Sequence, residues 1–404
     1  MKIKLFLIVL FTLNIYISDI VFAESNPNIL SEAAILIDSK TGEVLYEKNA
    51  HAKMYPASLT KIATAIYALE KGDLNDVVTV SKNARQVDGS RVYLEEGEKV
   101  QLRKLIQGLL INSGNDAGVA IAEHLDGSIE TFATKLNSYL SKLGVENTNF
   151  ENSHGLFNPK HVTTAEDLAK ITQYAMKNEE FREIFGTKEL EWKGTSWQTT
   201  IYTHHKLMRE NPYDGVTGGK TGYIPQSGNT LVTTANRNEL SLIAVILKGS
   251  NQQMTYKDTV ELLDYGFNHF KTSYIPKGTM FPVKGEKFLT TKDFYYTQSS
   301  NENVIKNVNE NGMLEIVNEN QEIIASLQLK DVQEKSEGLS KKQVETESGG
   351  SLKGNGYLFG FLLITFSILS LFYIRAKIRH KRNKKFRPNH HVGPAKYGRT
   401  IRFK

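Results

Sequence analysis

Residues 55–69 of this 404-residue chain read YPASLTKIATAIYAL, a proline followed by apolar side chains at helical spacing. The apolar positions are Leu59, Ile62, Ala63, Ile66 and Leu69. The pattern predicts a helix, in whose first turns Ser58 and Lys61 share one side because they are three residues apart. A serine hydroxyl becomes a nucleophile when a neighbouring base takes its proton, so the stretch predicts a nucleophilic serine with a lysine base.

Two further motifs make this interpretation specific, because a Ser-x-x-Lys tetrad alone recurs by chance about once or twice in a chain of this length. The first, SGN at residues 113–115, follows a predicted helix at residues 102–109 and lies on a connection. We expect Asp116 to cap the next helix. The second, KTG at residues 220–222, follows two glycines, which allow a ligand to approach the backbone closely. A predicted β-hairpin, residues 229–234 and 241–247, comes after it.

Two other features suggest binding sites but have simpler interpretations. The letters KTG also occur at residues 40–42, between strand-like runs at 34–37 and 44–46, and this placement predicts a hairpin turn. His204 and His205 are adjacent, so on a strand they point to opposite faces and cannot chelate a metal together. One of the two is a candidate for lining a cleft.

The three motifs, in this order, resemble those of the low-molecular-mass penicillin-binding proteins, and the SGN form resembles their D-Ala-D-Ala carboxypeptidases. The likeness covers residues 26–271, with further matching runs at 34–49, 152–156, 163–168 and 262–267. It implies the β-lactamase-like, penicillin-binding transpeptidase fold, a mixed α/β domain with an antiparallel sheet flanked by helices. Residues 272–330 resemble the family's small all-β second domain in position and composition.

The resemblance implies a serine-type carboxypeptidase of cell-wall synthesis, which removes the terminal D-alanine from peptidoglycan stem pentapeptides through a Ser58 acyl-enzyme. β-Lactams would acylate the same serine as substrate mimics. The implied catalytic residues are Ser58, Lys61 and Ser113, and the implied substrate-binding residues are Asn115, Lys220, Thr221, Gly222 and Tyr223. Endopeptidase or transpeptidase action, or a β-lactam or muropeptide sensor without turnover, remain alternatives.

Other expectations concern the chemistry of the site. Burial beside Lys220 is expected to lower the pKa of Lys61, so that it can act as a base. The resemblance assigns the donors that bind the oxyanion to the backbone N–H groups of Ser58 and Tyr223. Relatives often carry an arginine for the terminal carboxylate ahead of the closing helix, and residues 254–257 hold none. His154 lies in the run NSHGL, which the family uses structurally, and no metal or organic cofactor is implied.

Both ends of the chain have the character of targeting segments. Residues 1–23 combine early lysines, an apolar run and a final alanine, which predicts a signal peptide. Residues 356–374 carry no charge and are long enough to cross a bilayer as a helix. Residues 375–404 hold 12 Lys or Arg and no acidic residue, so the positive-inside rule predicts a cytoplasmic tail. We therefore expect a single-pass membrane protein with an extracellular catalytic domain, joined to its anchor by a flexible stalk at residues 331–355.

The charge balance agrees with this topology. Subtracting the 12 cations of the tail from the chain's 50 leaves 38 basic against 44 acidic residues, so the exported part is mildly acidic despite the net charge of +6. The expected partner of the tail is anionic membrane lipid, and no nucleic acid is expected. The chain has no cysteine, which excludes disulfides and thiol chemistry and suits export by a Gram-positive bacterium.

Overall fold

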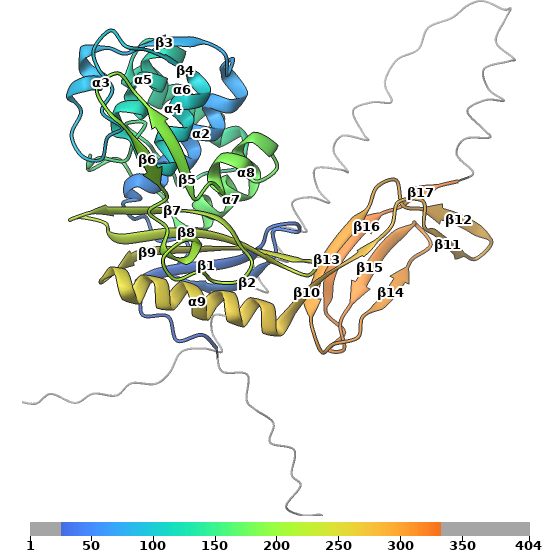
Figure 1. Cartoon of the computed structure of the whole chain (residues 1–404). Helices are drawn as coiled ribbons and strands as arrows, with labels where there is room; N and C mark the ends of the chain where they lie inside the picture. Colours follow the sequence, from blue (N-terminus) through green and yellow to red (C-terminus); the bar gives the residue numbers. More distant parts are fainter. Residues whose placement is uncertain (1–25, 333–404) are drawn as a thin grey trace, which may run out of the picture. The chain divides into compact units, whose positions relative to one another are not determined.

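The computed structural model describes residues 26–332, and its central feature is a five-stranded antiparallel sheet (Figure 1). In spatial order its strands are β2 (Val44–Lys48), β1 (Ala33–Asp38), β9 (Leu240–Gly249), β8 (Gly228–Arg237) and β7 (Val216–Ile224). Strand β1 is buried throughout, and successive side chains of a strand point to opposite faces. Ile35 joins the core shared with most of the helices, whereas Leu36 joins the core beneath α9 (Gln252–His269). Both faces of the sheet are therefore covered.

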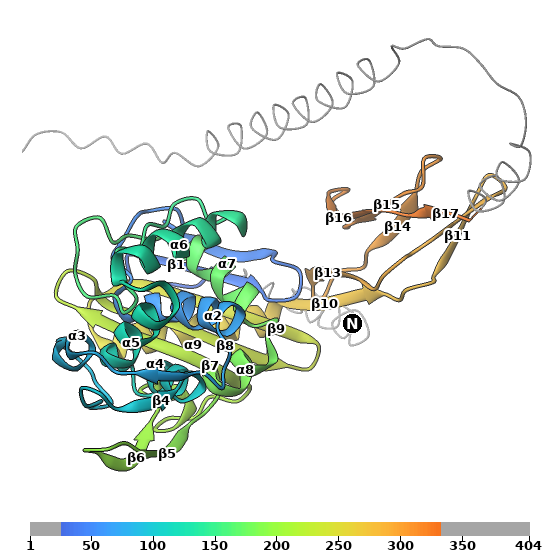
Figure 2. The ribbon, with the colours of Figure 1, turned by 90° about the horizontal axis from the view of Figure 1, so that it is seen from above.

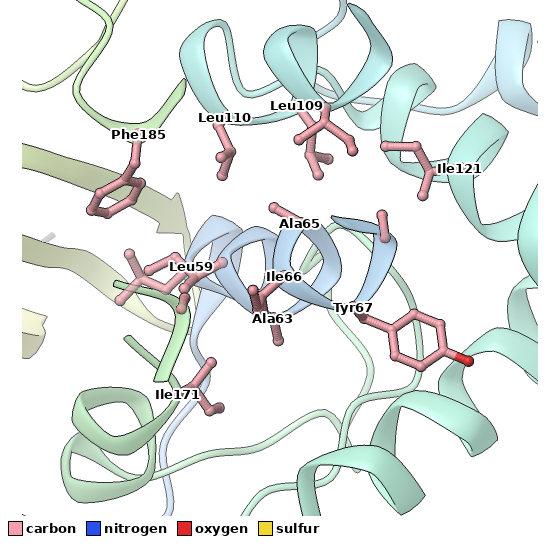
Figure 3. Packing of buried hydrophobic residues seen from close by; sticks show 14 of the residues in the cluster. Leu59, Ala63, Ala65, Ile66, Tyr67, Leu109, Leu110, Ile121, Ile171 and Phe185 are labelled. Atoms are coloured by element: carbon pink, nitrogen blue, oxygen red, sulfur yellow. The ribbon is translucent and has the colours of Figure 1, made fainter. Parts of the chain in front are cut away.

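Helix α2 (Thr60–Lys71) lies at the centre of the helical region, and its residues from Thr60 to Ala68 are all buried (Figure 3). A 3-10 turn, η1 (Ala57–Leu59), leads into it. The helices that contact α2 are α4 (Leu102–Ile111), α5 (Asn115–Asp126), α6 (Ile129–Lys142), α7 (Ala165–Ala175) and α8 (Glu179–Phe185). Since interiors are packed as densely as organic crystals, this surrounding core fixes the positions of side chains in the first turn of α2.

Small elements complete the helical region. Strand β3 (Val77–Thr79) pairs with β4 (Lys99–Gln101), and α3 (Lys82–Gln86) lies between them in the sequence. Strand β5 (Glu189–Lys193) pairs with β6 (Gln198–Tyr202), and a 3-10 turn, η2 (Lys206–Met208), precedes β7.

After α9 the described chain consists of strands (Figure 2). Strand β10 (Phe270–Ile275) continues directly from α9 and pairs with β13 (Phe294–Ser299). Two three-stranded sheets follow, β11 (Met280–Val283), β12 (Glu286–Leu289) and β17 (Lys330–Asp331), and β14 (Ile305–Val308), β15 (Met313–Val317) and β16 (Ile323–Gln328). They share a hydrophobic core around Leu314 and Ile316.

Asp38, at the end of β1, connects this β-rich segment to the central sheet. Its fully buried carboxylate accepts hydrogen bonds from the hydroxyls of Thr272 and Thr297, at 2.6 and 2.8 Å. A buried carboxylate without donors is costly, so the two hydroxyls stabilise the buried Asp38.

Several expectations about local structure are confirmed. Residues 40–42 form the turn between β1 and β2, and residues 229–247 form the β8–β9 hairpin. The prediction that Asp116 caps α5 is wrong, because Gly114 is the N-cap and Asn115 already belongs to the helix. The carboxylate of Asp116 instead accepts the backbone N–H groups of Val92 and Leu94, which pins a neighbouring loop.

The predicted signal peptide, membrane helix and basic tail lie outside the described residues, as does the stalk from residue 333 onward. Within residues 26–332, no helix combines the length and apolar character that crossing a membrane requires.

Candidate active site

The predicted nucleophile and base lie in contact. Lys61 Nζ donates to Ser58 Oγ at 2.8 Å and to the carbonyl oxygen of His154 at 2.8 Å. The Lys61 side chain has 0% exposure, whereas Ser58 is half-buried. Burial lowers the pKa of Lys61 well below its usual value of 10.5, the Lys220 cation lowers it further, and Asp116 opposes both. Burial and the neighbouring cation therefore both favour the neutral amine, the form that can accept the serine proton.

The second and third motifs also meet. Lys220 Nζ donates to Ser113 Oγ at 3.0 Å and to the carbonyl oxygen of Thr221 at 2.8 Å. Lys220 is 3% exposed, and burial lowers its pKa from 10.5 to about 7. Ser113 lies after the end of α4 with a φ of 60°, a left-handed conformation that is uncommon outside glycine. The short turn between α4 and α5 thus presents the Ser113 hydroxyl to Lys220.

Asn115 and Asp116 hold the loop that faces this turn. Asn115 Nδ2 donates to the carbonyl oxygen of Asp88 at 2.6 Å, and the backbone N–H of Asn115 donates to the carbonyl oxygen of Ser90 at 2.7 Å. Together with the bonds from Asp116 to the following residues, these contacts fix Ser90 at the edge of the cleft. The Asn115 amide is therefore engaged in bracing the loop.

Gly222 allows strand β7 to approach the nucleophile. A Cβ atom at this position would lie 2.9 Å from Ser58 N and 2.5 Å from Thr230 Oγ1, so any side chain would push the strand away. The next residue, Tyr223, is 64% exposed. The edge of β7 and the η1 turn thus form two sides of one opening, in agreement with their contact in the fold.

A cleft of about 380 Å³ opens at these residues. It is lined by Ser58, Ser90, Ser113, His204, Thr221, Gly222, Tyr223, Asn229, Thr230, Leu231, Gln252, Thr255 and Tyr256. Five of the eight predicted site residues line it, while Lys61, Asn115 and Lys220 reach it by contact with lining atoms or loops. A larger cavity of about 860 Å³, near Lys40 and Arg182, contains none of the eight.

Some lining residues had no motif to reveal them. Ser90, Gln252 and Thr255 come from a loop and from α9, and only the folded chain brings them beside Ser58. His204 does line the cleft, whereas His205 is buried and shares a hydrogen bond with Thr233 Oγ1 at 2.7 Å. The expectation that one of the two histidines lines a cleft is thus confirmed.

The buried histidines His154 and His161 are uncharged. Burial, followed by the Lys61 cation, lowers the pKa of His154 and of His161 to about 3, so both rings are neutral at working pH. Within residues 26–332, no group of three His, Cys, Asp or Glu side chains is arranged to hold a metal ion.

Known proteins are similar to this chain in sequence. The family model described as D-alanyl-D-alanine carboxypeptidase, peptidase family S11, matches residues 20–251. The D-alanyl-D-alanine carboxypeptidase DacF of Bacillus subtilis is 34% identical over 265 residues, which are 64% of this chain and 68% of DacF. DacC of Escherichia coli is 32% identical over 296 residues, 69% of this chain and 70% of DacC.

Solved structures agree with the sequence comparisons. Penicillin binding protein 5 from Haemophilus influenzae superposes with a TM-score of 0.69 at 26% identity, over 76% of this chain and 98% of that protein. The DD-transpeptidase of Streptomyces K15, solved as a point mutant, superposes with a TM-score of 0.57 at 29% identity, over 60% of this chain and 99% of the other.

Proposed function

This chain belongs to the D-alanyl-D-alanine carboxypeptidase family of serine peptidases, and we propose that it removes the terminal D-alanine from peptidoglycan stem pentapeptides through a Ser58 acyl-enzyme. The observation that carries the proposal is the 2.8 Å contact between Ser58 Oγ and the buried Nζ of Lys61. An amine whose pKa is lowered by burial and by Lys220 can accept the hydroxyl proton, which a solvated lysine cannot do at neutral pH. β-Lactams acylate the same oxygen.

Acylation transfers the acyl group of the substrate to Ser58 and releases D-alanine. Ser58 Oγ attacks the carbonyl carbon between the two D-alanines, and its proton passes to Lys61 Nζ. The backbone N–H groups of Ser58 and Tyr223 stabilise the oxyanion that forms on the carbonyl oxygen. When the C–N bond breaks, the Ser113 hydroxyl gives its proton to the leaving D-alanine amine and takes up the proton that Lys61 received from Ser58, which returns Lys61 to its neutral form; Ser113 Oγ lies 3.0 Å from Lys220 Nζ. Water then hydrolyses the ester and frees Ser58.

The substrate's terminal carboxylate is bound at the KTG strand. Lys220 and the Thr221 hydroxyl suit an anion, and Thr221 lines the cleft. Gly222 keeps the strand close enough to contact the substrate backbone. Since the arginine of many relatives has no counterpart at residues 254–257, Lys220 supplies the charge for carboxylate recognition. Asn115 holds the substrate amide by its own amide, and its contacts also keep the Ser90 loop at the edge of the cleft.

The full-length chain in detergent tests this function directly. Incubation with diacetyl-Lys-D-Ala-D-Ala should release free D-alanine, and labelled penicillin should form one covalent adduct per chain. Ser58→Ala should abolish both, and added glycine as an acceptor amine distinguishes hydrolysis from transpeptidation by the product formed. Release of D-alanine by Ser58→Ala at the wild-type rate would overturn the mechanism, and labelling of the wild type without turnover would indicate a sensor.

The proposal extends to the arrangement of the whole chain. A signal peptide at residues 1–23 directs export, and a helix at residues 356–374 anchors the catalytic region, residues 26–271, outside the membrane. The β-rich region, from β10 to β17, and the stalk that follows it separate the two, and the tail at 375–404 contacts lipid on the cytoplasmic side. Extraction of the intact chain by alkaline carbonate without detergent would contradict the anchor.

A further inference from the structure

A chain of buried hydrogen bonds ends at the peptide bond before the nucleophile. His161 Nε2 lies 2.8 Å from Thr60 Oγ1, and the Thr60 hydroxyl donates to the carbonyl oxygen of Ala57 at 2.9 Å. Thr60 and Ala57 are fully buried and His161 is 2% exposed. None of these three side chains lines the cleft.

The direction of the hydrogen bonds follows from the surroundings of the imidazole. His161 Nδ1 accepts the backbone N–H of Glu151 at 3.0 Å, so this nitrogen carries no proton. Because the ring is neutral, its proton is on Nε2 and is donated to Thr60 Oγ1. The single hydroxyl proton of Thr60 then goes to Ala57. Each member therefore has one compatible role, and the bonds polarise one another.

The carbonyl at the end of this chain belongs to the same planar unit as the N–H of Ser58. Peptide planarity fixes the Ser58 N–H antiparallel to the Ala57 carbonyl, so whatever orients one orients the other. Ala57 has a φ of 49°, which costs an alanine roughly 1–2 kcal/mol, so neighbouring contacts must hold this conformation. Gly155 leaves room for this conformation, since a Cβ there would lie 1.9 Å from the Ala57 oxygen.

From this geometry we propose that His161 is a positioning residue, which acts through Thr60 to aim the Ser58 N–H at the oxyanion of the acylation step. The inference rests on the proposed function, because it requires Ser58 as nucleophile and its N–H as a donor to the oxyanion. A donor aimed at developing charge accelerates acyl transfer, and loss of one such donor costs about 100- to 1,000-fold in rate. Misaiming the donor should cost less than losing it.

The test compares rates of penicillin acylation among variants of the full-length chain. Thr60→Val keeps the shape of the side chain but removes the hydroxyl, and we expect acylation to slow by about 10- to 100-fold. Thr60→Ser should restore it. His161→Gln places an N–H near the position of Nε2 and should retain most of the rate, whereas His161→Asn reaches only the Nδ1 position and should behave like Thr60→Val.

Thr172→Val is the matched control. Thr172 lies in α7, is fully buried, and donates to the carbonyl oxygen of Leu168 at 2.7 Å, a bond within the helix that involves neither the Ala57–Ser58 peptide nor Lys61. It should lose similar stability in denaturant while acylating at the wild-type rate. Because His161 stays neutral, the pH profile of acylation should keep its shape in Thr60→Val, with a uniformly lower rate.

Two outcomes would overturn the inference. One is wild-type acylation by Thr60→Val, and the other is an equal loss of rate in Thr60→Val and Thr172→Val at equal stability, which would assign the effect to general loosening. Both leave the proposed function standing, since that depends on Ser58→Ala losing its label. Final labelling of Thr60→Val should still reach one adduct per chain, only more slowly.

Discussion

Replacing Lys220 by methionine should abolish activity and yet stabilise the fold. Lys220 is 3% exposed, and burial lowers its pKa from 10.5 to about 7. At about 1.4 kcal/mol per pH unit, this shift represents roughly 5 kcal/mol that the protonated lysine costs the native state. Methionine has a similar shape but also loses the hydrogen bonds to Ser113 and Thr221, worth about 1 kcal/mol each. The expected net gain is about 2–3 kcal/mol at neutral pH.

The pH dependence identifies the cause. Because the native pKa is lowered, the unfolded chain binds more protons than the native one between about pH 7 and 10.5, so wild-type stability rises with pH through this window. The advantage of Lys220→Met should therefore be greatest at pH 7 and below and should shrink toward pH 10. Urea unfolding of the full-length chain in detergent, at pH 6.5 and at pH 10, measures the difference in free energy of unfolding between Lys220→Met and the wild type.

A surface lysine provides the comparison. Lys142→Met removes the same charge from an exposed position at the end of α6, and its effect should stay within about 0.5 kcal/mol at both pH values. If Lys220→Met were less stable than the wild type at pH 6.5, with the same gap at pH 10, the buried cation would not be the dominant cost.

Three other changes test separate parts of the structure. Lys220→Gln removes the cation that lowers the pKa of Lys61, so the rise in penicillin acylation rate with pH should shift to higher pH. A pH profile that keeps its position would refute the coupling between the two lysines. Asp38→Ala removes the acceptor of two threonine hydroxyls, of which only Thr297 keeps another partner, Thr41 Oγ1, and urea unfolding should show a loss of about 2–4 kcal/mol, with Asp38→Asn losing less. Gly222→Ala should slow acylation at least about 100-fold, because a Cβ would lie 2.9 Å from the backbone nitrogen of the nucleophile; labelling at the wild-type rate would contradict this contact.

The sequence predicted the elements that carry strong local patterns. The α2 stretch, the α4 helix and the β8–β9 hairpin have periodic apolar residues or a polar turn, and the structure confirms all three. The junction after α9 was harder to predict, because β10 begins at Phe270 directly where the helix ends, with no glycine or proline between them. Residue 271 therefore lies inside a strand.

Side-chain partners across the fold were beyond local patterns. Asp116 has the sequence position of a helix cap, but the loop around Val92 and Leu94 offers two backbone donors that only the folded chain brings to its carboxylate. The same holds for the cleft, where His204 and Gln252 reach Ser58 from segments about 150 and 190 residues away. Motif spacing identifies the reacting groups, whereas the walls of the cleft depend on sheet register and helix packing.

The site concentrates features that are unfavourable by themselves. Two lysines are buried beside each other, and Ala57 and Ser113 hold left-handed backbone conformations at its edges. Each such residue costs of order 1–3 kcal/mol and persists only where the surroundings over-determine it. Those surroundings are the helices that encase α2 and the strand β7 that Gly222 brings against the nucleophile. A Ser58–Lys61 pair on an exposed helix would have a charged lysine and no base, so the large apolar core around α2 is itself a condition for the chemistry.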